Sequence, residues 1–384
     1  MTKTSNQRII TYDNLVFLFQ GDIMNVISVI MAAFAAVAAI DLIIGNKLGL
    51  GKEFERGIHM LGEITLAMMG MIVLSPVLAA LLTQPLTAIS NIIPIDPSSF
   101  IGAIIANDMG GGQMALQLAA DERIGYFNGL VVASMMGATV SFTLPFVMGA
   151  VKKEQRKSML LGLLCGVCTI PFGCIVGGLM SGIEIVTLLI NLSPLILLSA
   201  VLSVGIIFIP NVAVKIFNVI GIAIRTVVIL GLAVGIFEFL TGYDIMPYTS
   251  PEVTTEGAVV IFNIACVMAG AFPLLNLVSR LIKKPLSSLG KHTGLNETSV
   301  LGFLSSLATS APTFGMMQDM DDKGVVLNSA FAVSGAFILA DHLAYTLSFN
   351  AEYLPAVMTG KIISGVLAVA LAAIIYKKNS RAAN

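Results

Sequence analysis

The sequence predicts an all-α, multi-pass membrane protein built from two inverted-topology repeats. Three observations support this fold class. The 384-residue chain is 57% hydrophobic and only 11% charged, whereas soluble chains carry about 25% charged residues. Long apolar runs recur along the chain, and two of them are interrupted in the middle. The second half also matches the first half at a constant offset. The formal net charge of −1 argues against nucleic acid as a partner.

The apolar runs define the expected membrane spans, because a transmembrane helix needs about 20 apolar residues. Nine full spans are expected, at 24–44, 57–83, 124–149, 158–181, 184–209, 225–243, 257–281, 324–348 and 354–376. Residues 1–23 lack a secretory cleavage pattern, and Met24 begins the first clean apolar run. We therefore interpret 1–23 as an N-terminal extension and Met24 as the natural start.

Two interrupted stretches, 97–120 and 297–318, are predicted to form re-entrant helical hairpins. Each stretch follows a residue that favours a helix start, Asp96 in one case and Asn296 in the other. Glycines at 110–112 interrupt the first stretch, and Pro312 interrupts the second. Each arm then has about ten residues and a length of roughly 15 Å, which is half of the hydrocarbon thickness.

The two halves of the chain align without gaps at an offset of 200 positions. The identical residues include Gly57, Met68, Gly70, Pro85, Ser99, Gly102, Asp121, Asn128 and Ser134, which match Gly257, Met268, Gly270, Pro285, Ser299, Gly302, Asp321, Asn328 and Ser334. The expected first repeat is 24–181 with hairpin 97–120, followed by a linker helix at 182–213 and a second repeat at 214–384 with hairpin 297–318. The alternative explanation is chance similarity between apolar sequences.

Loop charges indicate that the halves are inverted, because cytoplasmic loops carry an excess of Lys and Arg. The 45–56 loop has three basic residues and its counterpart at 245–256 has none, whereas the 84–96 loop has none and its counterpart region at 280–291 has four. The 150–157 loop is also basic. This pattern places the N-terminus outside and the C-terminus in the cytoplasm.

Inverted repeats with broken helices are typical of secondary transporters, whose substrates bind near the membrane midplane at the repeat interface. The candidate substrate-binding residues at the hairpin tips are Asn107, Asp108, Gly110, Gln113, Thr309, Ser310, Thr313 and Phe314. Asp108 is expected at the C-terminal end of a half-helix, where the helix dipole is negative. We interpret its carboxylate as a ligand of an ammonium or metal cation. The alternative is a carboxylate that caps the glycine-rich turn or pairs internally.

Asp341 and His342 are further candidates, because ionisable residues inside an apolar span are functional candidates by default. The alternative is a structural pair that contacts a neighbouring helix. Glu63 and Asn263 are secondary candidates, although Glu63 with His59 also fits an interfacial pair. The C-x-x-C at Cys165 and Cys168 is interpreted as apolar helix packing. No cofactor, metal site or enzymatic activity is expected.

Three motifs, ANDMGGG at 106–112, APTFGMM-x-x-MD at 311–321 and ADHL at 340–343, together resemble the ethanolamine permease family of the bacterial ethanolamine-utilisation pathway. The resemblance extends from Met24 to about Tyr376. It implies a transporter in the bacterial cytoplasmic membrane that imports ethanolamine, a small protonated amine with one hydroxyl group. Asp108 would bind the ammonium group. The hydroxyl-side candidates are Asn107, Gln113, Thr309, Ser310 and Thr313.

Two alternative functions stay open at this point. One is transport of another small cation or amino alcohol, coupled to H⁺ or Na⁺. The other is a membrane-embedded enzyme that uses Asp108, Asp341 and His342 as acid and base, although the sequence has no nucleophile motif. Glycine spacing at Gly162–Gly166 and Gly173–Gly177 permits close helix contacts, within one chain or in a homo-oligomer.

Overall fold

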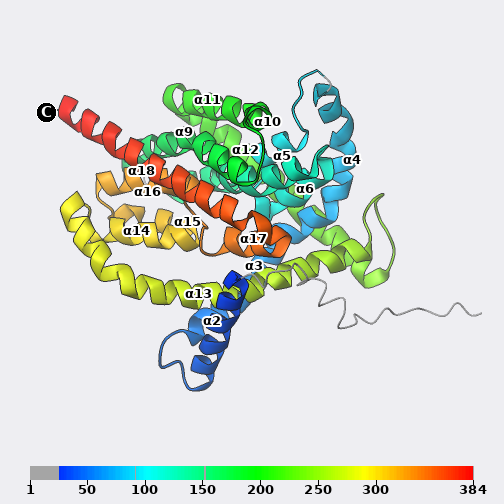
Figure 1. The fold of residues 1–384 in the computed structure, drawn as a ribbon, viewed down its shortest axis with the longest axis horizontal. Coiled ribbons are helices and arrows are strands. Elements are labelled where there is room, and N and C mark those ends of the chain that lie inside the picture. The colour runs from blue at the N-terminus through cyan, green and yellow to red at the C-terminus, as the bar shows by residue number, and fades with distance from the viewer. Residues whose placement is uncertain (1–25, 91, 151–152, 384) are drawn as a thin grey trace, which may run out of the picture.

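The computed structural model describes residues 26–90, 92–150 and 153–383, and every element within these ranges is a helix (Figure 1). The expected extension at 1–23 and its boundary at Met24 lie outside the described residues. Segments that are not regular α-helix carry the label η. The helices that build the body are α2 (Val26–Ile43), α3 (Gly51–Ile64), α4 (Gly70–Ser90), α8 (Leu144–Ala150), α9 (Arg156–Met180), α12 (Pro210–Thr241), α13 (Pro251–Thr293), α16 (Asp322–Ser334), α17 (Asp341–Asn350) and α18 (Leu354–Ala383).

The described part of the chain has seven helices that are long and apolar enough to cross a membrane, or eight if a bent pair counts as one span. The seven are Val26–Ile43, Gly51–Ser90, Glu122–Val147, Arg156–Met180, Val219–Thr241, Pro251–Leu281 and Asp341–Asn379. A polytopic helical membrane protein is therefore confirmed. The predicted number of nine full spans is not reproduced.

The predicted span at 324–348 is wrong, because the chain is broken there. Helix α16 ends at Ser334 and α17 begins at Asp341. Between them, Phe337 has a positive φ of 64°, and its amide donates a hydrogen bond to the carbonyl of Ser306 at 2.9 Å. The amide of Leu339 likewise donates to the carbonyl of Leu307 at 2.8 Å. The backbone groups that the break frees are thus satisfied by the second hairpin.

The predicted linker helix at 184–209 is two helices rather than one. Helices α10 (Ile185–Asn191) and α11 (Ser193–Phe208) meet at an angle of 47°. Pro194 lies in the first turn of α11, where its missing amide proton is tolerated. Helices α4 and α13 also extend beyond the predicted spans, so much of the predicted loop 84–96 and of its basic counterpart 280–291 is helical. The relative orientation of the two halves stays a prediction.

The first interrupted stretch turns back on itself. Helix α5 (Ser98–Ile104) is followed by extended backbone, the short turn η2 (Asn107–Met109) and α6 (Gly111–Leu118). The amides of Ala120 and Asp121, at the end of the stretch, donate to one carboxylate oxygen of Asp96 at 2.9 and 3.0 Å. Both ends of the stretch therefore lie together, as a hairpin requires.

The second interrupted stretch has the same form, with α14 (Glu297–Ala308) followed by α15 (Ser310–Met316). The amide of Asn296 donates to Oδ1 of Asp321 at 3.0 Å, so its ends also meet. The break lies at Thr309, which is extended, and not at Pro312. Pro312 lies in the first turn of α15, where a proline removes no intrahelical hydrogen bond.

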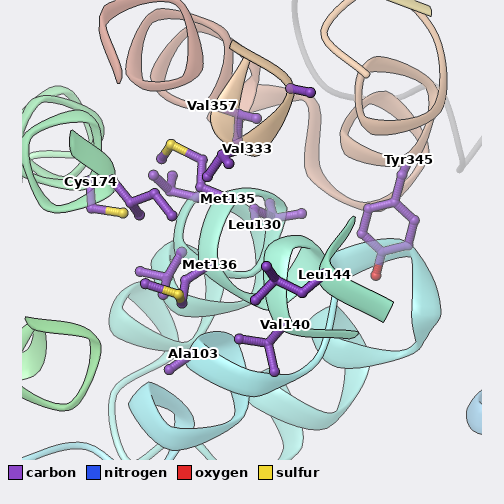
Figure 2. Packing of buried hydrophobic residues seen from close by; sticks show 14 of the residues in the cluster. Ala103, Leu130, Met135, Met136, Val140, Leu144, Cys174, Val333, Tyr345 and Val357 are labelled. Carbon is purple, nitrogen blue, oxygen red and sulfur yellow. The ribbon is translucent and has the colours of Figure 1, made fainter. Parts of the chain in front are cut away.

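The core surrounds an irregular helix made of the π-helical segments η3 (Phe127–Gly137) and η4 (Thr139–Thr143), and all residues of η3 are buried. Figure 2 shows Leu130, Met135 and Met136 of η3 packed with Val333 of α16 and Val357 of α18. Helices α9 and α18, which are far apart in sequence, cross so closely that a methyl group on Gly173 would overlap the carbonyl oxygen of Gly360.

Several residues matched at the 200-position offset make equivalent contacts. A methyl group on Gly102 would overlap the carbonyl oxygen of Asn128, and one on Gly302 would overlap the side chain of Asn328. Asp121 and Asp321 each cap the helix that follows by accepting hydrogen bonds from its backbone amides. These shared contacts support the proposed duplication.

We predict opposite effects for two glycine-to-alanine changes. A methyl group on Gly70 would overlap the carbonyl oxygen of Val228 in α12, whereas one on Gly62 in α3 meets no atom within 4 Å. Gly70→Ala should destabilise the protein by about 1–3 kcal/mol through overpacking. Gly62→Ala should be neutral or stabilising by up to about 1 kcal/mol through helix propensity. Thermal unfolding of both detergent-solubilised variants measures the difference, and equal melting temperatures would refute the close α4–α12 contact.

Candidate functional site

Asp108 lies at the tip of the first hairpin, within the turn η2. Extended backbone at Ile105 and Ala106 separates this turn from α5, and Gly110, in the left-handed region with φ of 87°, precedes α6 as its N-cap. Asp108 is therefore not at the end of a half-helix, and the dipole argument from the sequence is wrong. The Asp108 side chain is 26% exposed, so its carboxylate is accessible from one side.

The broken helix places His342 against this carboxylate. The distance from His342 Nε2 to Asp108 Oδ1 is 4.0 Å, and the imidazole is 1% exposed. The ring lies against Phe337, with 4.9 Å between the ring centroids. The break at 335–340 thus turns the start of α17 toward the first hairpin, and this brings together two residues that are more than 200 positions apart.

Asp341 is half-buried in the first turn of α17. The next residue, His342, is the one that lies near Asp108. Glu63 itself is exposed. Asn263 is half-buried on α13, a helix that packs against both α3 and α17. Asp341, Asn263 and Glu63 therefore lie on three helices that are connected by packing against α13.

Tyr345 links α17 to the first hairpin and was not found by sequence reasoning. Its hydroxyl donates a hydrogen bond to Oε1 of Gln113 at 2.9 Å, and the whole side chain is buried. Gly112 faces this hydroxyl so closely that a methyl group there would overlap it. The sequence feature that could have identified Tyr345 is its hydroxyl three residues after His342, on the same face of the helix.

The predicted residues of the second hairpin divide into two groups. Thr313 donates to the carbonyl of Gly302 at 2.9 Å and lies 2.9 Å from the hydroxyl of Ser306, so it fastens the two arms together. Phe314 is buried in the core and packs on Phe146. Ser310, by contrast, is buried with a hydroxyl that has no partner among the described residues.

Other buried polar atoms at these breaks also lack hydrogen-bond partners within the described ranges. They are both side-chain heteroatoms of Asn107 and Nδ1 of His342. Buried polar groups in folded proteins are almost always paired, and an unpaired one costs about 1–3 kcal/mol. Asn107, Ser310 and His342 therefore have unused hydrogen-bonding capacity that a small polar ligand can satisfy.

Lys361 is the second functional candidate that sequence reasoning missed. It lies in α18, is 1% exposed, and donates through Nζ to the carbonyl of Ser134 at 2.7 Å. The turn η2, which carries Asp108, packs against η3, the segment that contains Ser134. The rule that selected Asp341, an ionisable residue within an apolar run, applies equally to Lys361 in the run 354–376.

A cavity of about 410 Å³ lies elsewhere in the molecule, bordered by Arg123, Glu352 and Tyr353 among others. None of the candidate residues borders this cavity. We place the candidate site at the first hairpin tip because ionisable residues and unpaired buried polar groups lie there. The volume of the other cavity is not by itself evidence of substrate binding.

These features define a multi-pass helical membrane protein with two broken hairpins and a buried ionisable cluster. The family described as "Ethanolamine utilisation protein, EutH" matches residues 23–375, and the chain belongs to this family. The chain is 41% identical to the "Probable ethanolamine permease EutH" of Listeria monocytogenes, over 93% of this chain and 95% of that protein. It is 35% identical to the protein of the same description from Escherichia coli, over 94% of this chain and 97% of that protein. It is 39% identical to the "Uncharacterized protein YxeR" of Bacillus subtilis, over 90% of this chain and 92% of that protein. No solved structure matches the chain.

We predict that Gly112→Ala is destabilising because the added methyl group displaces the Tyr345 hydroxyl. The expected loss is about 1–3 kcal/mol. Tyr345→Phe removes the overlapping oxygen, and the nearest remaining ring atom is then 3.0 Å from the methyl position. The double variant should therefore recover part of the stability lost in Gly112→Ala. Additive losses in thermal unfolding would show that the two residues are not in contact.

Proposed function

We propose that the protein is a permease that imports ethanolamine in its protonated form by alternating access. The observation that carries this proposal is Asp108, a partly exposed carboxylate at a broken hairpin tip inside an apolar protein. An ionised carboxylate in such surroundings is costly unless a cation pairs with it. Two relatives described as probable ethanolamine permeases support the choice of substrate.

The site offers partners for both ends of ethanolamine. Asp108 would accept hydrogen bonds from the ammonium group, and such charge-assisted bonds are short and strong. The proposed hydroxyl partners are Asn107 and Ser310, because both are buried without a partner in the described chain. Thr313 is a weaker candidate than the sequence suggested because its hydroxyl already bonds within the hairpin. Gln113 is engaged by Tyr345, and Thr309 supplies extended backbone at the second break.

The proposed movement is a displacement of the two hairpins relative to the other helices. The backbone leaves regular α-helical geometry at 105–110 and 309, within the two hairpins, and at 335–340, between α16 and α17. Such segments are where discontinuous transporter helices bind substrate and change shape. We place the protein in the bacterial cytoplasmic membrane, with the N-terminus outside and the C-terminus in the cytoplasm.

Two alternatives make different predictions. A carrier for another small cation or amino alcohol would let that compound compete with labelled ethanolamine more strongly than ethanolamine itself. A membrane-embedded enzyme would convert its substrate chemically in detergent solution. The membrane potential alone can drive a protonated amine inward, at about 2.3 kcal/mol per charge per 100 mV, so coupling to H⁺ or Na⁺ is not required.

The first experiment is uptake of labelled ethanolamine into proteoliposomes at fixed pH, with and without a negative-inside potential. We expect saturable uptake that the potential increases, because a net positive charge enters. A potential of 100 mV corresponds to an accumulation of about 50-fold for one charge, from 2.3 kcal/mol and 1.36 kcal/mol per factor of ten. Uptake no greater than in empty liposomes under any gradient would contradict the proposed substrate.

We predict that Asp108→Asn weakens ethanolamine binding by tenfold or more, because a hydrogen bond to a charged group contributes about 1.5–3 kcal/mol. The matched control is Asp244→Asn, which makes the same change at an exposed position and should leave uptake unchanged. Concentration-dependent uptake by both variants measures the effect. Wild-type affinity in Asp108→Asn would remove Asp108 from the site.

A further inference from the structure

The cavity of about 410 Å³ lies where several elements begin or end. Arg123, on its border, is the second residue of the apolar span Glu122–Val147. Met180, also on its border, is the last residue of the span Arg156–Met180. Glu352 lies in a short turn just before α18. Because the ends of apolar spans lie at the surface of the hydrocarbon core, the cavity is expected at a membrane surface.

The cavity and the first hairpin tip lie at opposite ends of two helices. Helix α6 leads from the tip turn, which carries Asp108, toward Arg123 at the open end of the hairpin. Helix α17 begins beside the tip and ends three residues before Tyr353, whose hydroxyl donates a hydrogen bond to the carbonyl of Arg123 at 3.2 Å. The ten residues of α17 span about 15 Å, which is roughly half of the hydrocarbon thickness. The cavity is therefore separated from Asp108 by about half of the membrane.

One face of α17 extends between these two ends. His342, Tyr345 and Phe349 are spaced three and four positions apart, so they lie on the same face of the helix. His342 is at the tip end, 4.0 Å from Asp108. The ring of Tyr345 stacks on that of Phe349, with 5.4 Å between the centroids. This face is therefore aromatic over most of its length.

The aromatic series continues to the cavity. The ring of Tyr126 lies 5.9 Å from that of Phe349 and 5.4 Å from that of Tyr353, measured between centroids. Tyr353 borders the cavity. Aromatic faces attract organic ammonium ions, so such a series favours a cation over other small solutes. The rings pack against one another in this structure, and an ion passes them only when the helices separate, as alternating access requires.

Two groups of opposite charge at the cavity have unused hydrogen-bonding capacity. Glu352 is exposed, and its carboxylate makes no hydrogen bond or ion pair among the described residues. The guanidinium of Arg123 has five N–H donors, and in the described chain it donates one hydrogen bond, to the carbonyl of Gly182 at 3.4 Å. An amino alcohol matches both groups, because its ammonium can donate to Glu352 while its hydroxyl oxygen accepts from Arg123.

We propose that this cavity is a vestibule that binds the protonated amine at Glu352 before the amine passes along the aromatic series to Asp108. The proposal rests on the proposed function and adds a second binding site for the same substrate. In the predicted orientation the basic loop 150–157 is cytoplasmic, and α9 crosses from it to Met180. The vestibule then opens on the outer face, from which the substrate arrives. Binding there is weak because water screens exposed charges, which allows onward release.

The first experiment detects the vestibule without transport. The chain has no tryptophan, so Met180→Trp introduces a single fluorophore at an exposed position on the cavity border. Titration of this detergent-solubilised variant with ethanolamine hydrochloride at constant ionic strength should give a saturable change in emission, and uncharged ethylene glycol should give none. The change should persist after Asp108→Asn is added. Absence of a saturable change, or its loss with Asp108→Asn, would overturn the proposal.

Glu352 is tested in the same fluorescent background. Glu352→Gln should weaken the titration by about threefold or more, which is the scale of an exposed ion pair. The control Glu184→Gln makes the same change at an exposed position that follows α9 and does not border the cavity, so it should have no effect. An unchanged titration in Glu352→Gln, or an equal effect of both changes, would remove Glu352 from the vestibule.

Uptake into proteoliposomes tests whether the vestibule supplies Asp108. Glu352→Gln should raise the KM for ethanolamine by about threefold or more and leave the maximal rate within about twofold, because the vestibule affects arrival and not the movement of the loaded carrier. A wild-type KM, or a change confined to the maximal rate, would overturn this role. Absence of uptake by the wild-type protein would contradict the proposed function, and the fluorescence titration would still decide whether the cavity binds the amine.

Discussion

The structure depends on the need to satisfy main-chain polar groups where helices break inside an apolar protein. A membrane core supplies no water for free amides and carbonyls, so each break requires internal partners. Asp96 meets this need at the ends of the first hairpin by accepting from two backbone amides. At the break between α16 and α17, the carbonyls of Ser306 and Leu307 accept from amides of the turn at 335–340. The second hairpin and the break in the later helix therefore stabilise each other.

The same breaks assemble the candidate site. In a continuous helix over 324–348, the adjacent residues Asp341 and His342 would point to different faces of that helix. The interruption at 335–340 instead places both residues at the start of α17, and His342 reaches Asp108. Glycines permit the close approach of the other elements, as at Gly112 beneath the Tyr345 hydroxyl. Irregular backbone in this protein is thus what brings distant ionisable residues together.

Sequence reasoning predicted the features that depend on local composition. Apolar runs located most of the spans, and cap residues at Asp96 and Asn296 located both hairpin starts. It failed where tertiary contacts decide the backbone. No residue pattern within 324–348 indicates that the backbone amides of Phe337 and Leu339 bond to the second hairpin. Pro312 was misread as a break because a proline in a first helical turn and a proline at an interruption look alike in sequence. Lys361 was missed by oversight, since the rule for intramembrane charges already included it.

The ionisable cluster also bears on what kind of carrier this site can form. Asp108 is a partly exposed carboxylate at a broken helix, and the buried imidazole of His342 lies 4.0 Å from it. A carboxylate in an apolar protein is costly unless a cation pairs with it. A protonated amine supplies that cation through its ammonium group, whereas an uncharged alcohol does not. This argument favours an ammonium compound over an uncharged alcohol as the proposed substrate.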